Sequence, residues 1–348
     1  MFRSHLQAFQ SQFNPLLAEF LDRQTSNLPG GSDLSQQLVA QVKDLTLRGG
    51  KRLRPALLYC TYIGITDLNP QLALQAGLAC ELMESSLLIH DDIMDQDQLR
   101  RGGPTVHQAL AEQTESQQLG GSLAILAGNL CAFWGLNALM DLDTQDHTKQ
   151  SLIKLYSNIM LDECLGQSLD LELSHANDWP DEQTILQMYE YKTARYTTQF
   201  PAQLGLTLAQ APRQYQTAFD QIGLDLGLAF QIQDDLIGVF GNSEQTGKST
   251  SSDLESGKKT LLLNKALKLA PPKDKEEMLH ILNQKPIKQT QADQMRSLLE
   301  ASGARTYCHN LAQNLLTKAQ EKIIELDLRK EGKAFLLGLS DYLLNRKS

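Results

Sequence analysis

The chain has 348 residues, of which 41% are hydrophobic, enough for one large domain or two ordinary ones with a sizeable core. Its formal net charge of -9 argues against general binding to nucleic acid. The five cysteines lie far apart and form no CxxC pair, so we expect buried, reduced thiols of a cytoplasmic protein.

Helix-length segments follow one another along the whole chain. Breaks rich in Gly, Pro, Asn and Asp separate them, and apolar residues recur three and four positions apart. Ser32-Asp33, before Leu34, and Asp181, before Thr184, are capping residues at which we expect two helices to start. The apolar stretch 123–140 contains two Asn and two Gly, which favours a buried core helix over a membrane span. No stretch alternates like a strand, so we predict one all-α domain over 1–348.

A glycine-containing basic segment, RGGKRLRP, occupies residues 48–55 of this acidic chain. Backbone amides and guanidinium groups in such a segment can bind phosphate oxygens. A Walker loop is not expected, because GxxxxGK[ST] is absent here and the GKS at 247–249 has neither that spacing nor a preceding strand. The alternative for Lys51, Arg52 and Arg54 is a surface charge run.

Aspartates crowd the end of an apolar helix-like segment, LLIHDDIMD, at residues 87–95. Asp91 and Asp95 are four positions apart and therefore share one face of a helix. Carboxylates without histidine or thiol partners suit a hard ion such as Mg²⁺. A similar segment, FQIQDDLIG at 230–238, supplies Asp234, although Gly238 stands four positions after it.

Two simpler interpretations of the first aspartates remain open. They could be a solvated helix end, or His90 and Asp91 could belong to a metal-dependent phosphohydrolase of the HD type. The seven histidines are scattered and give no partner pattern for the second interpretation.

Together these segments resemble the trans-polyprenyl diphosphate synthase family. GGKRLRP resembles its isopentenyl-diphosphate motif, DDIMD and FQIQDD its two Asp-rich motifs, and YKTA (191–194) its KT motif. GQSLDLEL (166–173) and the polar stretch GKSTSSDLESGKKT (247–260) resemble a further helical motif and the lysine-bearing lid. Six motifs in order, over about 48–260, are a strong signal where any one alone is weak. The resemblance implies a single polyprenyl synthetase domain, a bundle of about a dozen helices around a central cavity, and a homodimer.

The resemblance also implies a reaction. An allylic diphosphate loses diphosphate, the double bond of isopentenyl diphosphate attacks the allylic cation, and a proton is lost. The implied Mg²⁺ ligands are Asp91, Asp95 and Asp234, while Asp92 and Asp235 orient waters or neighbouring groups. The implied allylic-diphosphate ligands are Arg100, Lys192, Lys248 and Lys258, and those of isopentenyl diphosphate are Lys51, Arg54 and Arg101. Lys192, Thr193 and Gln231 form the implied catalytic group, in which Thr193 and Gln231 direct oxygen dipoles at the cation.

Three positions depart from the family pattern. Glu84 stands where His or Gln usually contacts isopentenyl diphosphate. A carboxylate there would repel diphosphate, so we expect either that a nearby Lys or Arg neutralises it or that the affinity for substrate is lower. Gly238 ends the second Asp-rich motif without a carboxylate, and Asn129 stands where Asp is common.

The residues just before Asp91 give an expectation for the length of the hydrocarbon product. Short-product relatives carry bulky aromatics one turn before the first Asp-rich motif, where this chain has Ser86 and Leu87. Met83 is then the first bulky candidate for a tunnel floor. We predict geranylgeranyl diphosphate as the product, with farnesyl or a longer polyprenyl diphosphate as alternatives.

Two other functions within the same resemblance are open. A weakly active or regulatory subunit typically loses one Asp-rich motif, whereas this chain keeps both apart from Gly238. A terpene cyclase needs no second diphosphate site, and the intact GGKRLRP segment argues against it.

Overall fold

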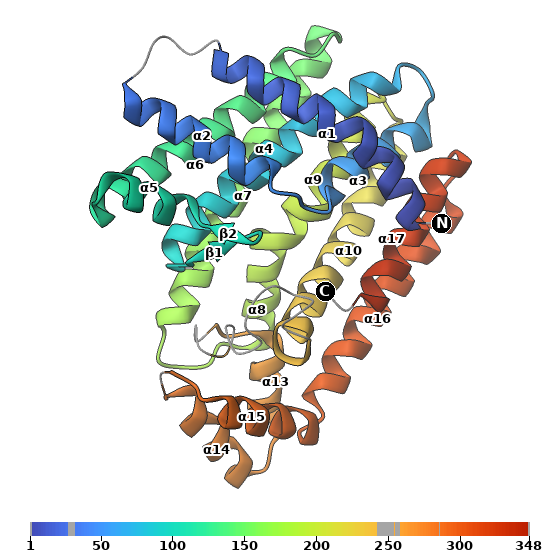
Figure 1. The fold of residues 1–348 in the computed structure, drawn as a ribbon. Coiled ribbons are helices and arrows are strands. Elements are labelled where there is room, and N and C mark those ends of the chain that lie inside the picture. Colours follow the sequence, from blue (N-terminus) through green and yellow to red (C-terminus); the bar gives the residue numbers. More distant parts are fainter. Residues whose placement is uncertain (1, 27–31, 242–253, 255–257, 285, 347–348) are drawn as a thin grey trace. The chain divides into compact units, whose positions relative to one another are not determined.

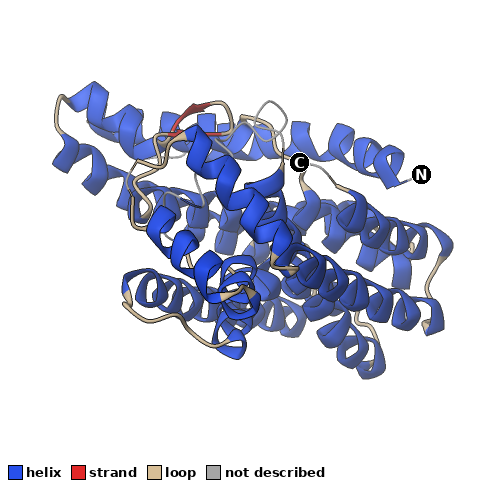
Figure 2. Ribbon diagram, turned by 90° about the horizontal axis from the view of Figure 1, so that it is seen from below, coloured by secondary structure: helices blue, strands red, loops and turns tan. Residues whose placement is uncertain are grey.

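The computed structural model describes residues 2–26, 32–241, 254, 258–284 and 286–346. Helices make up most of this part of the chain (Figure 1). Its strands are a single short antiparallel pair, β1 (Leu99–Arg100) and β2 (Gly103–Pro104), drawn in red in Figure 2. The prediction of an all-α fold is confirmed.

The chain divides into two compact units, each described by itself. The first comprises Met1–Tyr156, Leu204–Ala211 and Leu328–Phe335. At its centre two long helices lie side by side, the cyan and green ones labelled α4 and α6 in Figure 1. Its complete helices are α1 (Phe2–Ser26), α2 (Asp33–Leu47), α3 (Leu53–Ile65), α4 (Pro70–Met94), α5 (Val106–Thr114) and α6 (Gln117–Met140).

The second unit comprises Ser157–Gln203, Pro212–Asp327 and Leu336–Ser348. Its long helix α10 packs along α16 and along the π-helix η1. Its complete helices are α8 (Glu182–Tyr189), η1 (Glu190–Gln199), α10 (Arg213–Phe240), α13 (Leu261–Leu269), α14 (Pro272–Leu282), α15 (Gln289–Ala301) and α16 (Ala304–Glu325). The helices α7 (Asp146–His175), α9 (Phe200–Leu208) and α17 (Lys330–Asn345) contribute residues to both units. A single domain over 1–348 stays a prediction.

Local sequence explains where individual helices begin. The Ser32 hydroxyl accepts a hydrogen bond from the Ser35 amide at 3.4 Å and caps α2. The Asp181 carboxylate accepts one from the Thr184 amide at 2.7 Å and caps α8. Each cap satisfies an amide that has no partner within the helix. Both predicted N-caps are confirmed.

Two helices are long and apolar enough to cross a membrane by length and composition alone, α4 and α6. Within the structure, 89% of the most apolar window of α4 and 50% of that of α6 are buried, which is a property of core helices in globular proteins. The prediction of a buried core helix therefore holds for one face of α6. The other face exposes apolar side chains seven residues apart, here called the α6 stripe: Leu119, Leu126, Phe133 and Met140.

All five cysteines are free thiols. Four of them are buried, as expected, but Cys164 on α7 is exposed, so the expectation of burial is wrong at this position. Burial raises the pKa of Cys60, Cys80 and Cys131, which keeps these thiols protonated and unreactive.

Candidate active site

The basic segment forms a tight loop between α2 and α3. Gly49 and Gly50 adopt φ values of +89° and +108°, which side chains other than glycine rarely tolerate. Arg52 also has a positive φ, +54°, and its side chain turns inward, whereas Lys51 is exposed. The loop thus divides its cations between the interior and the surface.

Arg52 is only 4% exposed and anchors the loop. Its guanidinium donates to the Thr46 carbonyl at 2.9 Å and to Asn14 Oδ1 at 3.2 Å, and it pairs with the Glu81 carboxylate. A surface charge run is therefore wrong for Arg52.

Glu81 on α4 joins two separate segments of the first unit. Its Oε1 accepts from Arg52 and also from Arg101, at 3.4 Å, and Arg101 donates further to the Leu45 carbonyl at 3.3 Å. Burial raises the pKa of Glu81, while Arg52 and then Arg101 act against that increase. Sequence reasoning missed Glu81, although a lone acidic residue within the apolar run 72–83 was a usable signal.

Glu84 pairs with Arg54. The Arg54 guanidinium lies 3.0 Å from Glu84 Oε2, and both side chains are largely buried. Of the two outcomes expected at Glu84, a neutralising cation is the one present. That cation, Arg54, is one of the residues that the resemblance implies as ligands of isopentenyl diphosphate. In this structure Arg54 faces a carboxylate instead.

At the end of α4, Asp92 is wholly buried and holds Arg100. Arg100 Nε donates to Asp92 Oδ1 at 2.6 Å, and its Nη2 donates to Asp97 Oδ2 at 2.8 Å and lies 3.7 Å from Asp91. Burial raises the pKa of Asp92 to about 6, against the opposing charge of Arg100. Asp92 therefore positions a guanidinium beside Asp91.

Asp91, on the last turn of α4, and Asp95, its C-cap, remain partly accessible. The Asp95 amide donates to the Asp91 carbonyl at 2.8 Å, so the helical spacing predicted for the two carboxylates is present. Within the residues that the structure describes, no group of three or more His, Cys, Asp or Glu side chains is arranged to hold a metal. Two hard oxygen ligands fit Mg²⁺, which usually keeps several waters and binds phosphate as well.

In the second unit, Lys192 and Thr193 lie within the π-helix η1. Such helices are rare, and they are frequent at functional sites. Glycines let neighbouring helices approach it closely. A Cβ on Gly166 of α7 would lie 2.3 Å from the Lys192 amide nitrogen, and one on Gly227 of α10 would lie 2.4 Å from the Ala194 Cα. The glycine of the GQSLDLEL segment is thus a packing residue for the segment that carries Lys192.

The structure brings Thr193 and Gln231 together. The Thr193 hydroxyl donates to Gln231 Oε1 at 2.9 Å. Lys192 pairs with Asp170 of α7, with Nζ 2.5 Å from Oδ2. The ammonium group is therefore held by the GQSLDLEL segment.

Asp234 pairs with Arg346, near the end of the chain. Arg346 also donates to the Phe230 carbonyl at 3.0 Å, and its guanidinium lies 4.2 Å from the centre of the Phe230 ring. Sequence reasoning missed Arg346, because more than a hundred residues separate it from Asp234.

The lid segment is described only at Leu254 and at its end. Lys258 is half-buried before α13, and the neighbouring Lys259 donates to the carbonyls of Ala176 and Asp178 at 2.5 and 2.6 Å. Lys248 lies outside the described residues, as do the other lid residues up to 253 and those at 255–257. The end of this segment is therefore fixed to residues that follow α7.

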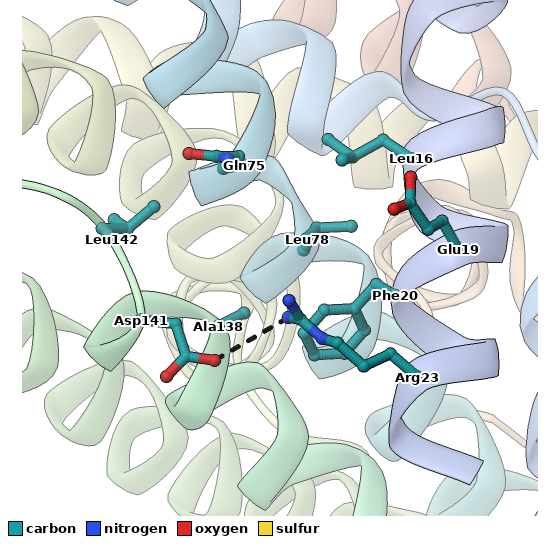
Figure 3. A pocket seen from close by; sticks show the side chains of 9 residues that line it. All are labelled: Leu16, Glu19, Phe20, Arg23, Gln75, Leu78, Ala138, Asp141 and Leu142. Carbon is teal, nitrogen blue, oxygen red and sulfur yellow. Dashed lines mark ion pairs between the residues drawn. The ribbon is translucent and has the colours of Figure 1, made fainter. Parts of the chain in front are cut away.

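A pocket of about 190 Å³ lies at the other end of α4, shown in Figure 3. At a rise of about 1.5 Å per residue, Leu78 lies roughly 20 Å along α4 from Asp91. Arg23 and Asp141 face each other across the pocket with 3.8 Å between them (Figure 3). Its lining residues are Leu16, Glu19, Phe20, Arg23, Gln75, Leu78, Ala138, Asp141 and Leu142. It is separate from the Asp-rich end of the helix.

Comparisons with known proteins agree with these motifs. The polyprenyl synthetase family model matches residues 35–299. A geranylgeranyl diphosphate synthase of Saccharolobus solfataricus is 33% identical over 86% of this chain and 87% of that protein. A short chain isoprenyl diphosphate synthase of Methanocaldococcus jannaschii is 33% identical over 78% of each chain. The crystal structure of a geranylgeranyl pyrophosphate synthase from Corynebacterium glutamicum, complexed with isoprenyl diphosphate and magnesium, superposes with a TM-score of 0.91 at 28% identity and covers 98% of this chain and 99% of that one. The chain belongs to the polyprenyl synthetase family.

Proposed function

We propose that the protein is a Mg²⁺-dependent trans-prenyltransferase that joins isopentenyl diphosphate to an allylic diphosphate. The observation that carries the proposal is the pair of accessible carboxylates, Asp91 and Asp95, with the Arg100 guanidinium held 3.7 Å from Asp91. Carboxylates can hold a divalent cation, and the cation and the guanidinium can share one diphosphate.

Asp91, Asp95 and Asp234 would hold Mg²⁺, which would supply positive charge for the departing diphosphate when bound. Arg100, Lys192, Lys248 and Lys258 would bind the allylic diphosphate, and Lys51, Arg54 and Arg101 would bind isopentenyl diphosphate. Thr193 and Gln231 would present oxygen atoms to the developing allylic cation. The departing diphosphate is the proposed acceptor of the proton.

We propose geranylgeranyl diphosphate as the product. Relatives named geranylgeranyl diphosphate synthase, from Saccharolobus solfataricus and Methanosarcina mazei, support this length. The chain also resembles a geranylfarnesyl diphosphate synthase of Aeropyrum pernix and a farnesyl diphosphate synthase of Mycobacterium bovis, which represent the longer and shorter alternatives. Below Ser86, the side chains of Leu82, Met83 and Ala79 are fully buried. These side chains would limit the growing hydrocarbon.

A homodimer is the proposed assembly, and the α6 stripe is its proposed interface. The four stripe residues are between 38% and 66% exposed and lie two helical turns apart on one face. Apolar side chains at this spacing are typical of helix pairs that bury them against a second copy. A cytoplasmic location stays a prediction.

Replacing Asp91 tests the reaction itself. We expect Asp91→Ala to lower kcat by roughly a thousandfold or more, because a lost metal ligand acts on the leaving group. Helix content by circular dichroism should not change. The control is Asp67→Ala, an exposed aspartate paired with Arg329 at the surface, which should keep full activity. Near-normal turnover of Asp91→Ala with Mg²⁺ present would contradict the assignment.

The Glu84–Arg54 pair gives a second prediction. We expect Glu84→Gln to lower the KM for isopentenyl diphosphate by about threefold to tenfold, because Arg54 no longer faces a carboxylate. The KM for the allylic substrate should change much less. Glu112→Gln, an exposed residue of α5, is the control. Equal changes in both KM values, or none, would place Glu84 outside the isopentenyl-diphosphate site.

Product length should respond to the residues before Asp91. Ser86→Phe should shorten the product, because a ring would fill the path one turn above Met83, and Met83→Ala should lengthen it. Ser86 is fully buried, so thermal unfolding must first show that Ser86→Phe is folded. Reversed-phase chromatography of the dephosphorylated products gives the lengths. A wild type that stops at farnesyl diphosphate, with no change in Ser86→Phe, would overturn the tunnel argument alone.

The assembly can be measured directly. Phe133→Glu places a charge in the α6 stripe and should convert a dimer into a monomer at micromolar concentration. Sedimentation equilibrium gives the mass. Leu68→Glu, at an exposed position outside the stripe, should leave the mass unchanged. If wild type and Phe133→Glu have the same mass in solution, the α6 stripe is not the dimer interface.

A further inference from the structure

A buried tyrosine connects the end of the lid segment to the second Asp-rich motif. Tyr189 is the last residue of α8 and is 2% exposed. Its hydroxyl group accepts a hydrogen bond from the Leu261 amide at 2.8 Å and donates to Asp235 Oδ2. Leu261 is the first residue of α13, three positions after Lys258. One phenol therefore contacts both the start of α13 and the carboxylate next to Asp234.

The hydrogen bonds continue from Asp235 to Thr193. Gln231 Nε2 donates to Asp235 Oδ1 at 2.9 Å, and Gln231 Oε1 accepts from the Thr193 hydroxyl at 2.9 Å. Asp235 is 6% exposed, so its carboxylate depends on such donors for stabilisation. The residues from Leu261 to Thr193 thus form one continuous relay within the second unit.

Each hydrogen bond in the relay has only one possible direction. A backbone amide only donates, so the Tyr189 oxygen accepts from Leu261 and its single hydrogen goes to Asp235. A carboxylate only accepts, so the Gln231 amide must turn its NH₂ group toward Asp235. Its carbonyl then faces Thr193, which must donate to it. The Thr193 oxygen is left to present lone pairs rather than a hydrogen.

Tyr189 is well suited to remain a donor. Burial first, and then the charge of Asp235 and the hydrogen bond to it, raise its pKa well above the ordinary value. The hydroxyl therefore keeps its proton throughout the pH range in which enzymes operate. A plain core tyrosine would need a partner for its hydroxyl, but that partner would not be the carboxylate on which Gln231 and Thr193 depend.

We propose that Tyr189 is a positioning residue whose hydroxyl holds the Asp235 carboxylate in the position from which it orients Gln231 and Thr193 toward the allylic group. The inference rests on the proposed function, because orientation matters only if an electron-poor carbon faces these oxygens. Lone pairs directed at developing positive charge lower the energy of the transition state, whereas a hydroxyl hydrogen directed at it raises that energy.

A double-mutant cycle tests this role. Tyr189→Phe removes only the hydroxyl, and Thr193→Val removes the group at the other end of the relay with little change of shape. We expect each to lower kcat about tenfold or more, with KM values for both diphosphates within about threefold of wild type. If the relay acts as a unit, the double variant should be no slower than the slower single variant. If the two losses of kcat multiply in the double variant, Tyr189 acts through packing alone.

Tyr191→Phe is the matched control. Tyr191 lies two residues further on, half-buried, and its ring stacks 4.0 Å from the Arg195 guanidinium outside the relay. This variant should keep kcat within about twofold, since it removes a hydroxyl from the same segment without touching Asp235. An equal loss in both tyrosine variants would overturn the proposal.

Hydrogen exchange tests the relay without turnover. Tyr189→Phe leaves the Leu261 amide without its acceptor, so exchange at the start of α13 should accelerate about tenfold or more, but not in Tyr191→Phe. Unchanged exchange would contradict the relay. If wild type exchanges slowly there but makes no prenyl product, the relay stands and the proposed function fails.

A second variant serves if Tyr189→Phe does not fold. Asp235→Asn then replaces it in the cycle with Thr193→Val, because an amide at position 235 reverses the orientation of the Gln231 amide. If the two losses of kcat multiply in that cycle, the proposal is again overturned.

Discussion

A buried carboxylate is stable only if a cation or hydrogen-bond donors replace its lost hydration. Both Asp-rich motifs contain one such carboxylate, and its partners determine how the neighbouring side chains are placed. Asp92 is wholly buried and accepts a hydrogen bond from Arg100. Asp235 is almost fully buried and accepts hydrogen bonds from Tyr189 and Gln231. Removing one partner of such a buried group typically costs about 3–5 kcal/mol for an ion pair. The second aspartate of each motif therefore fixes its neighbours in place.

The first aspartate of each motif has the opposite environment. The Asp91 side chain is 24% exposed and that of Asp234 is 45% exposed. Each nevertheless has a guanidinium nearby, Arg100 in the first unit and Arg346 in the second. Adjacent residues on one helix point in different directions. A DD pair can thus combine an accessible carboxylate for a ligand with a buried one that positions the surrounding cations and donors.

Features determined by neighbouring residues were predictable from the sequence. The N-caps at Ser32 and Asp181, the helical spacing of Asp91 and Asp95, and the all-α fold all depend on contacts within a few residues. A cation beside Glu84 was also one of two predictable outcomes, since an unpaired carboxylate would repel diphosphate. Its identity, Arg54, depends on how α3 packs against α4.

Features that depend on tertiary packing were not predictable. The sequence EYKTARYTTQ gives no sign of a π-helix. Gly166 of α7 and Gly227 of α10 lie so close to it that an added Cβ would clash with its backbone. Arg52 lies between Lys51 and Arg54 in one basic segment, yet it has a positive φ and its side chain pairs with Glu81 in the interior. Tyr189 and Arg346 meet the second Asp-rich motif across 46 and 112 residues, and no local pattern marks such contacts.

The central claim is that this chain catalyses prenyl transfer, and one assay of the unmodified protein tests it most directly. The purified protein is incubated with isopentenyl diphosphate, farnesyl diphosphate and Mg²⁺, and the products are separated after dephosphorylation. The account predicts a linear prenyl alcohol longer than farnesol, together with release of diphosphate, and no product when the metal is chelated. A cyclic hydrocarbon in its place, or no turnover by a folded protein, would contradict it.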